Sequence, residues 1–225
     1  LLTRLSHLNT STISDTLDYY GLVGATTGLL PLSHRKKIVG RANTVQLEAI
    51  AKRKGQTHFL TSAIKSIEMR DQILVVAGGV DGIACWDSSL SAAALRRSIV
   101  GSVIDGMCRE ADDGMSDSYP IFGAGLTTIS GERRISHVSS GAPVVVAGVV
   151  VHPGDYVIAD RCGTVFIPTA MIESVVATAE RIFRKKADIA QAIISGQSLL
   201  KIMPEQQLEA ACKSRSKSTW GKFHF

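Results

Sequence analysis

The residue types best suited to chemistry stand close together in residues 75–113, where Arg109 is followed directly by Glu110. An arginine side chain carries a planar fork of N–H donors that matches a carboxylate or a 2-oxo acid. A neighbouring carboxylate can hold a hard cation such as magnesium through oxygen and water ligands. The pair therefore predicts a pocket for a small 2-oxo acid and a divalent metal ion. The alternative is that the pair is a solvated surface ion pair.

A second group of candidates, Asp87, Ser88, Ser89 and Leu90, precedes this pair and is expected to open a helix. The first amides of a helix lack partners inside the helix and can bind an anion such as a substrate carboxylate. Asp87 is also a favoured residue type for capping a helix N-terminus. Its negative charge lies where an anionic substrate should bind, so Asp87 has a second predicted role as a metal ligand.

Both groups are predicted to lie at one edge of a sheet. The apolar residues 73–77 predict a strand, residues 84–99 a helix, and residues 101–105 a second strand. A strand, helix, strand unit requires parallel strands. Because ligands collect at the carboxyl ends of such strands, we expect the two candidate loops to share one pocket.

The rest of the pattern predicts an α/β fold in which helices flank a central sheet. Helical spacing recurs near both ends of the chain, and short apolar strands cluster after Gly141. The last helix is expected to bury Ile172, Val176, Ile182 and Ile189. The predicted helices are 5–20, 57–69 and 169–195, and the further predicted strands are 39–49, 144–151, 156–159 and 165–167.

Composition favours a folded domain, because 45% of the 225 residues are hydrophobic. We expect one α/β domain over residues 1–203 and a basic tail over 204–225 that docks on a neighbouring subunit. The apolar run 142–151 is too short to span a bilayer. No basic segment followed by an apolar one opens the chain, so a cytoplasmic location is expected.

The formal net charge of +5 raises the question of nucleic acid. The basic residues gather in clusters at 35–37 and 184–186 and in the tail, with no stacking aromatic residues between them, so we expect solvated faces rather than a nucleic-acid site. The four cysteines have no CxxC spacing, and we expect free thiols. These are Cys85, Cys108, Cys162 and Cys212.

Several other polar residues are given structural roles. Asp155 and Asp160 stand in predicted turns, where carboxylates accept hydrogen bonds from backbone amides. Residues His58, His137 and His152 have no metal-ligand spacing and are expected to be ordinary surface or hydrogen-bonded histidines. No GxGxxG motif supports a dinucleotide site.

Three motifs of this sequence resemble the family that contains the 4-hydroxy-4-methyl-2-oxoglutarate aldolases and the regulator of ribonuclease E activity. The resemblance covers about residues 5–198. The motifs are Gly78-Gly79 with Trp86 before a helix, VIDGxxR with an acid over 103–110, and VHPGDYVIADRCGTVFIP over 151–168.

The resemblance implies an RraA-like α/β domain of the swivelling type that forms a homotrimer or a hexamer, with active sites at subunit boundaries. It implies that Arg109 binds the oxo and carboxylate oxygens of the substrate. Glu110 would carry magnesium or manganese, partly through water, and the loop 87–90 would give amides to the substrate carboxylate. The implied activity is metal-assisted aldol cleavage or oxaloacetate decarboxylation that releases pyruvate.

The sequence also departs from the family pattern. Glu110 stands where the aldolases usually have Asp, and Asp87-Ser88 stands where they usually have Gly followed by an acid. Ser88 thus replaces the family's candidate for proton transfer. The same family contains a non-catalytic inhibitor of an RNA-degrading enzyme, and this protein-binding role is the rival prediction. Retention of an acid at Glu110 favours the enzyme, whereas loss of the loop acid favours the rival.

Overall fold

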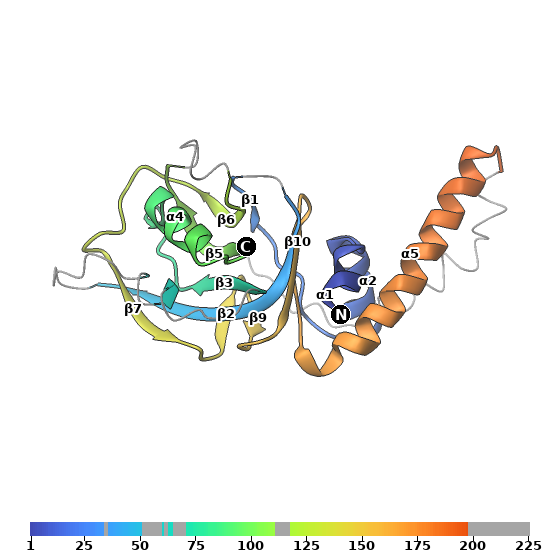
Figure 1. Ribbon diagram of the computed structural model, residues 1–225, viewed down its shortest axis with the longest axis horizontal. Helices are drawn as coiled ribbons and strands as arrows, with labels where there is room; N and C mark the ends of the chain where they lie inside the picture. Colours follow the sequence, from blue (N-terminus) through green and yellow to red (C-terminus); the bar gives the residue numbers. More distant parts are fainter. Residues whose placement is uncertain (34–35, 51–59, 61–62, 65–70, 111–117, 198–225) are drawn as a thin grey trace, which may run out of the picture.

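The centre of the molecule is a mixed sheet that curls toward a closed barrel and is flanked by helices (Figure 1). The computed structural model describes residues 1–33, 36–50, 60, 63–64, 71–110 and 118–197. The order of paired strands is β1-β6-β5-β3-β2-β10-β11, with β4 paired to β5 and β7 to β2. The strands are β1 (Leu30–Pro31), β2 (Ile38–Ala49), β3 (Gln72–Ala77), β4 (Ala84–Trp86), β5 (Gly101–Cys108), β6 (Ile121–Leu126), β7 (Ile135–Ser140), β10 (Tyr156–Asp160) and β11 (Gly163–Ile167).

The strands that carry the candidate site form the parallel part of this sheet. Strand β3 lies between β2 and β5, both parallel to it, and β5 also pairs in parallel with β6. All six residues of β3 are buried, because helix α4 (Ser88–Arg96) covers one face of the sheet and a hairpin covers the other (Figure 1). The predicted parallel unit and the predicted α/β fold are therefore confirmed.

The covering hairpin consists of β8 (Val144–Val146) and β9 (Val149–Val151), so the prediction of a single strand over 144–151 is wrong. The chain reverses at Ala147 and Gly148, whose φ angles are 44° and 83°. Two successive residues with positive φ form the turn that suits the twist of a two-residue hairpin. The hairpin places alternate valines in the core beneath β3 and β5.

The predicted helix 5–20 is two helices, α1 (Leu2–Ser6) and α2 (Thr10–Tyr19). The break occurs because Asn9 caps α2: its side-chain oxygen accepts a hydrogen bond of 2.8 Å from the amide of Thr12. Both helices pack with the last helix against β10 and β11, where they form a separate apolar cluster.

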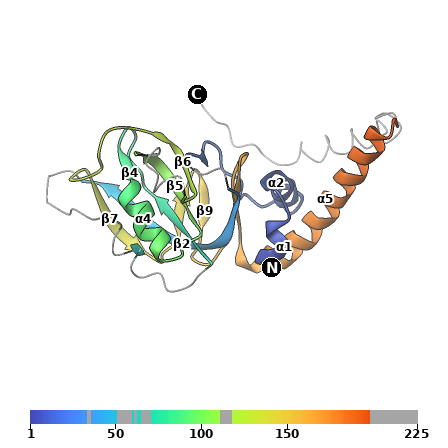
Figure 2. The same ribbon diagram turned by 45° about the horizontal axis from the view of Figure 1, so that its top comes forward.

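The last helix begins with a short 3-10 turn (Thr169–Met171) and continues as α5 (Ile172–Ile194). Ile172 and Val176 are buried as predicted, but Ile182 and Ile189 are only partly buried. The reason is visible in two views, where the second half of α5 extends beyond the sheet and the N-terminal helices (Figures 1 and 2).

The predicted capping carboxylates are confirmed. Asp155 accepts hydrogen bonds from the amides of His152 and Thr169, at 2.8 and 3.0 Å. Asp160 accepts from the amides of Thr10 and Cys162, both at 2.9 Å.

The expected free thiols are found at Cys85, Cys108 and Cys162, whereas Cys212 lies outside the described residues. Most of the predicted helix 57–69 and the whole predicted tail 204–225 also lie outside them. No helix among the described residues has both the length and the apolar character that crossing a bilayer requires.

Candidate active site

Two neighbouring strands bring the candidate residues together. Residues 84–86 form strand β4 rather than the first turn of the predicted helix 84–99, and β4 runs parallel to β5 with Trp86 opposite Cys108. The amide of Arg109 also donates a hydrogen bond of 3.0 Å to the carbonyl of Trp86. Asp87 and Arg109 therefore leave the same edge of the sheet side by side.

Asp87 is the N-cap of α4, as its residue type predicts. Its Oδ1 accepts hydrogen bonds from the amide of Leu90 at 3.0 Å and from the hydroxyl of Ser89 at 2.7 Å. The amide of Leu90, which was expected to bind the substrate carboxylate, is therefore bonded within the chain. Substrate contacts by the loop stay a prediction for Ser88 and Ser89.

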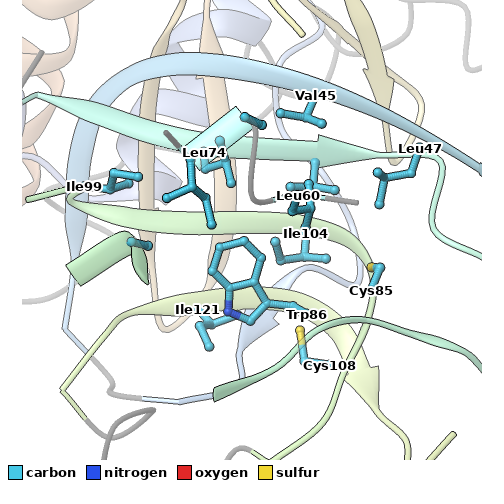
Figure 3. Packing of buried hydrophobic residues seen from close by; sticks show 14 of the residues in the cluster. Val45, Leu47, Leu60, Leu74, Cys85, Trp86, Ile99, Ile104, Cys108 and Ile121 are labelled. Atoms are coloured by element: carbon cyan, nitrogen blue, oxygen red, sulfur yellow. The ribbon is translucent and has the colours of Figure 1, made fainter. Parts of the chain in front are cut away.

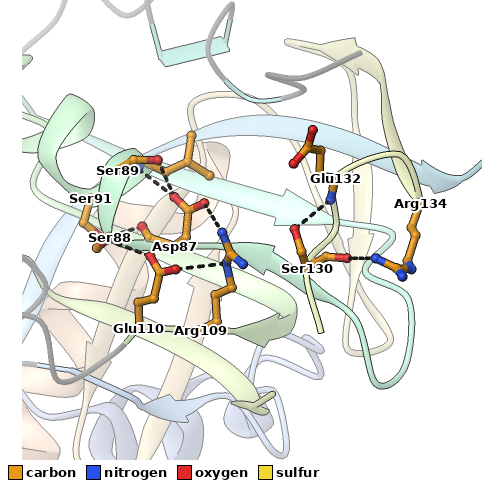
Figure 4. Close-up of polar contacts among 10 residues, drawn as sticks. Asp87, Ser88, Ser89, Ser91, Arg109, Glu110, Ser130, Glu132 and Arg134 are labelled. Atoms are coloured by element: carbon orange, nitrogen blue, oxygen red, sulfur yellow. Dashed lines mark hydrogen bonds and ion pairs between the residues drawn. The ribbon is translucent and has the colours of Figure 1, made fainter. Parts of the chain in front are cut away.

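Arg109 points toward two carboxylates (Figure 4). Its Nη2 lies 3.6 Å from Oδ2 of Asp87, and its Nε lies 3.4 Å from Oε1 of Glu110. These are ion-pair distances, slightly longer than direct hydrogen bonds. The three side chains are 31%, 24% and 38% exposed for Arg109, Asp87 and Glu110, so a small ligand in solvent can reach them.

Glu110 is held against the start of α4. Its backbone adopts a positive φ of 58°, and its Oε2 accepts a hydrogen bond of 2.8 Å from the hydroxyl of Ser88. A non-glycine residue in this region is strained by about 1–2 kcal/mol. The hydroxyl of Ser88, which stands where the family's candidate acid for proton transfer is expected, thus binds the predicted metal ligand Glu110.

Buried aromatic side chains pack next to the segment that carries Asp87. The indole N–H of Trp86 donates to Oγ of Ser91 at 2.9 Å, and its ring stacks on that of Tyr119 with centroids 6.1 Å apart. Burial raises the pKa of Tyr119, and its hydroxyl lies 2.9 Å from that of Ser102. Figure 3 shows Trp86 packed among apolar side chains from β3 and β5.

The oxygen atoms beside Arg109 suit a hard divalent cation. Two carboxylates and one hydroxyl, from Asp87, Glu110 and Ser88, lie at the start of α4. Magnesium typically binds one or two carboxylates and keeps several waters. No set of three or more His, Cys, Asp or Glu side chains suited to a metal ion occurs among the described residues.

Surface cavities of about 400 and 490 Å³ are lined by other residues. The smaller one is lined by Gln46 of β2, Gly78 directly after β3 and Asp105 of β5, among others. Asp105 supports the hairpin there, because its Oδ2 accepts a hydrogen bond of 2.8 Å from the amide of Ala147. The side chains of the charged cluster line neither of these cavities and are 24–38% exposed at the surface.

The structure thus brings the predicted site residues together. Arg109 forms ion pairs with Asp87 and Glu110, and the hydroxyls of Ser88 and Ser89 donate hydrogen bonds to Glu110 and Asp87, respectively. Sequence reasoning missed Ser91, which holds Trp86. Its position in the first turn of a helix that follows a buried tryptophan was the available signal.

Two of the histidines that were predicted to be ordinary surface or hydrogen-bonded residues have local partners. A ring nitrogen of His137 lies 2.8 Å from the hydroxyl of Ser140, and Nδ1 of His152 lies 3.7 Å from Asp155. His58 lies outside the described residues.

Residues 10–166 match the RraA-like family, which is described as Aldolase/RraA. The chain is 32% identical over 212 residues to the protein DlpA of Legionella pneumophila, an alignment that covers 94% of this chain and 34% of DlpA. It therefore spans about a third of the length of that relative. It is also 29% identical to a Halalkalibacterium halodurans protein named "Putative 4-hydroxy-4-methyl-2-oxoglutarate aldolase", over 83% of this chain and 84% of that protein.

Solved structures show the same fold. An uncharacterised protein from Pseudomonas syringae superposes with a TM-score of 0.80 at 28% identity, over 89% of this chain and 95% of that one. RraAS2 of Streptomyces coelicolor, described as an unusual member of the RNase ES inhibitor RraA protein family, superposes with a TM-score of 0.73 at 23% identity, over 83% of this chain and 93% of that one.

Proposed function

Because this chain belongs to the RraA-like family of Aldolase/RraA proteins, we propose that it is a lyase that cleaves a carbon–carbon bond of a small 2-oxo acid. The proposed reaction releases pyruvate, either from a 4-hydroxy-4-methyl-2-oxoglutarate-type substrate or from oxaloacetate. The proposal includes a divalent cation, magnesium or manganese, as cofactor.

One observation carries the proposal: Arg109 and Glu110 converge with Asp87 at the start of α4, in reach of solvent. A guanidinium binds a carboxylate and the adjacent oxo oxygen through parallel N–H groups. Arg109 would therefore orient the 2-oxo acid, and Glu110, held by Ser88, would hold the cation.

The chain's own residues supply binding and orientation in this proposal. When bound, a divalent cation would polarise the 2-oxo group of the substrate and stabilise the negative charge that develops as the bond breaks. Arg109 would stabilise the same charge through its N–H groups, which are held at the sheet edge by the bond from its amide to Trp86. The open cluster fits a site completed at a subunit boundary, so the proposal includes a homotrimer or hexamer.

The test is a pyruvate-release assay with oxaloacetate and with 4-hydroxy-4-methyl-2-oxoglutarate, with Mg²⁺ or Mn²⁺ and with a chelator. The wild-type chain is expected to turn over at least one substrate in a metal-dependent way. We expect Arg109→Ala to lower kcat/KM by about 10²–10³, the loss typical of removing one donor to a developing charge. Light scattering on the same samples gives the oligomeric mass.

The matched control is Arg133→Ala, because Arg133 is 63% exposed and, among the described residues, its ion pair with Glu132 is long at 4.0 Å. This control should retain wild-type turnover. An Arg109→Ala chain that is folded and as active as the control would contradict the proposal.

The second candidate is a non-catalytic protein that binds an RNA-degrading enzyme. The observation that favours it is the pairing of Asp87 with Arg109, which places a carboxylate on the group that should bind substrate. The absence of metal-dependent turnover of either 2-oxo acid, together with measurable binding of such an enzyme, is the result this candidate requires.

A further inference from the structure

The charges of the candidate site do not favour an anionic substrate. One guanidinium, that of Arg109, is paired there with two carboxylates, those of Asp87 and Glu110. The three groups together carry a charge of −1, and a 2-oxo acid carries one or two further negative charges. Each like-charge pair repels, and the repulsion is stronger near a protein surface than in bulk water because the effective dielectric constant is lower.

The two carboxylates also occupy one side of the arginine. The N–H bonds of Nε and of Nη2 project in parallel from the same edge of a guanidinium, and a carboxylate ligand can use that edge as a fork. In this structure Glu110 faces Nε, and Asp87 faces Nη2 (Figure 4). A substrate carboxylate would have to compete for this edge.

Both carboxylates are fixed by further contacts. Asp87 is the cap of α4 through Leu90 and also accepts from Ser89, whereas Glu110 accepts from Ser88. Moving Asp87 away from Arg109 would disturb the cap of α4, which stabilises the start of the helix. The pairing is therefore built into the start of the helix.

We propose that Asp87 makes binding of the 2-oxo acid depend on a divalent cation bound first. The inference rests on the proposed function and deepens it. A divalent cation beside Asp87 and Glu110 raises the local charge from −1 to +1, which changes repulsion of the substrate into attraction. Asp87 is thus a specificity-determining residue that suppresses binding of the acid to the metal-free protein.

The test measures binding rather than turnover, with pyruvate and Mg²⁺ as probes in titration calorimetry. Wild-type protein is expected to bind pyruvate at least about tenfold more tightly with saturating Mg²⁺ than with a chelator. Asp87→Asn keeps a capping side chain but removes the charge. We expect it to bind pyruvate about tenfold more tightly than wild type in the chelator, and Mg²⁺ alone about tenfold more weakly.

A second variant and a control keep the result interpretable. Asp87→Ser also caps a helix without charge, and it should reproduce both shifts if the asparagine variant fails to fold. Asp188→Asn removes one negative charge from an exposed position on α5, and it should change neither affinity.

Two outcomes would overturn the inference: folded Asp87 variants with wild-type affinities for both probes, or wild-type protein that binds pyruvate equally with and without Mg²⁺. Failure of the proposed function looks different. In that case wild-type protein shows the Mg²⁺-dependent binding of pyruvate but turns over neither 2-oxo acid, so the charge role of Asp87 stands without the lyase.

Discussion

Asp87 serves the helix and the site with different atoms of one carboxylate. Its Oδ1 accepts the hydrogen bonds that cap α4, and its Oδ2 faces the guanidinium of Arg109. The capping role follows from residue type and position, so the sequence alone predicts it. The ion pair depends on the pairing of β4 with β5, which places Arg109 near Asp87. No local pattern in the sequence predicts this strand pairing.

Ser91 holds the side chain of Trp86, the buried residue that directly precedes Asp87 of the site. It accepts from the buried indole of Trp86 at 2.9 Å, and both side chains are buried. Ser91→Ala leaves the indole N–H without this acceptor, which costs about 1–3 kcal/mol. We expect the free energy of unfolding in urea, followed by circular dichroism, to fall by that amount.

Ser174→Ala is the control for this prediction, because Ser174 is an exposed serine inside helix α5. Its effect should stay within about 0.5 kcal/mol. Equal stabilities of the two variants would show that the indole of Trp86 finds another hydrogen-bond partner and that Ser91 does not hold it in place.

At the scale of elements, the site depends on how closely the loop after β3 approaches β5. Gly79 has no room for a side chain: an added Cβ would lie 2.3 Å from the carbonyl oxygen of Asp105 and 2.6 Å from the Cα of Gly106. The amide of Gly79 donates to that same carbonyl at 3.0 Å. Gly79 thus allows close backbone contact between the loop after β3 and strand β5.

We predict that Gly79→Ala forces β3 and β5 apart and destabilises the fold by about 1–3 kcal/mol, the usual cost of overpacking. Thermal unfolding measures the change. Gly125→Ala is the matched control, since an added Cβ there meets only the flexible end of Met107 at 3.8 Å. An unchanged melting temperature for the Gly79 variant would mean that the two strands are not held at this distance.

Sequence patterns predicted the long elements better than the short ones. The apolar run of β3 and the alternation of β2 are strong signals, because full or one-sided burial dictates them. Strand β4 has three residues and passes directly into a helix through Asp87, so its apolar side chains were counted as helical. Asp87 could have marked this boundary, since a cap lies outside the helix that it begins.

Two further errors share a cause. The turn at Ala147-Gly148 and the break at Asn9 involve only one or two residues inside runs of helical or strand-like spacing. Hydrophobic periodicity averages over several residues and cannot resolve them. The pairing of β4 with β5 is a long-range contact that the sequence analysis did not predict, although the parallel unit over residues 73–105 did place both loops at one sheet edge.

For the molecule as a whole, three apolar clusters divide the interior. One lies under α4, one is enclosed by the sheet and the β8–β9 hairpin, and one joins the N-terminal helices to α5. The cluster under α4 contains two thiols, Cys85 and Cys108. Burial raises the pKa of Cys85 from 9.0 to about 12 and raises that of Cys108 well above its ordinary value.

These thiols predict a loss of stability at alkaline pH. The folded chain keeps both protons while the unfolded chain loses them above pH 9, so the stabilisation is complete below about pH 9 and is lost as the pH rises toward 12. Each thiol contributes up to about 1.4 kcal/mol per pH unit in that window. Urea unfolding at pH 8, 9, 10 and 11 measures the slope.

Cys85→Ala should reduce this slope, whatever it does to stability at pH 8, whereas Cys162→Ala should not, because Cys162 is exposed. A free energy of unfolding that stays constant between pH 9 and pH 11 would contradict the prediction.

The stacked tryptophan beneath the site has a practical consequence. The chain has two tryptophans, Trp86 and Trp220. Trp86 is 1% exposed and bonded to the first turn of α4, so its fluorescence should be that of an indole shielded from water. With Trp220 replaced by phenylalanine, the emission of the protein would come from one fluorophore, whose wavelength and quenching report optically on any rearrangement where α4 begins.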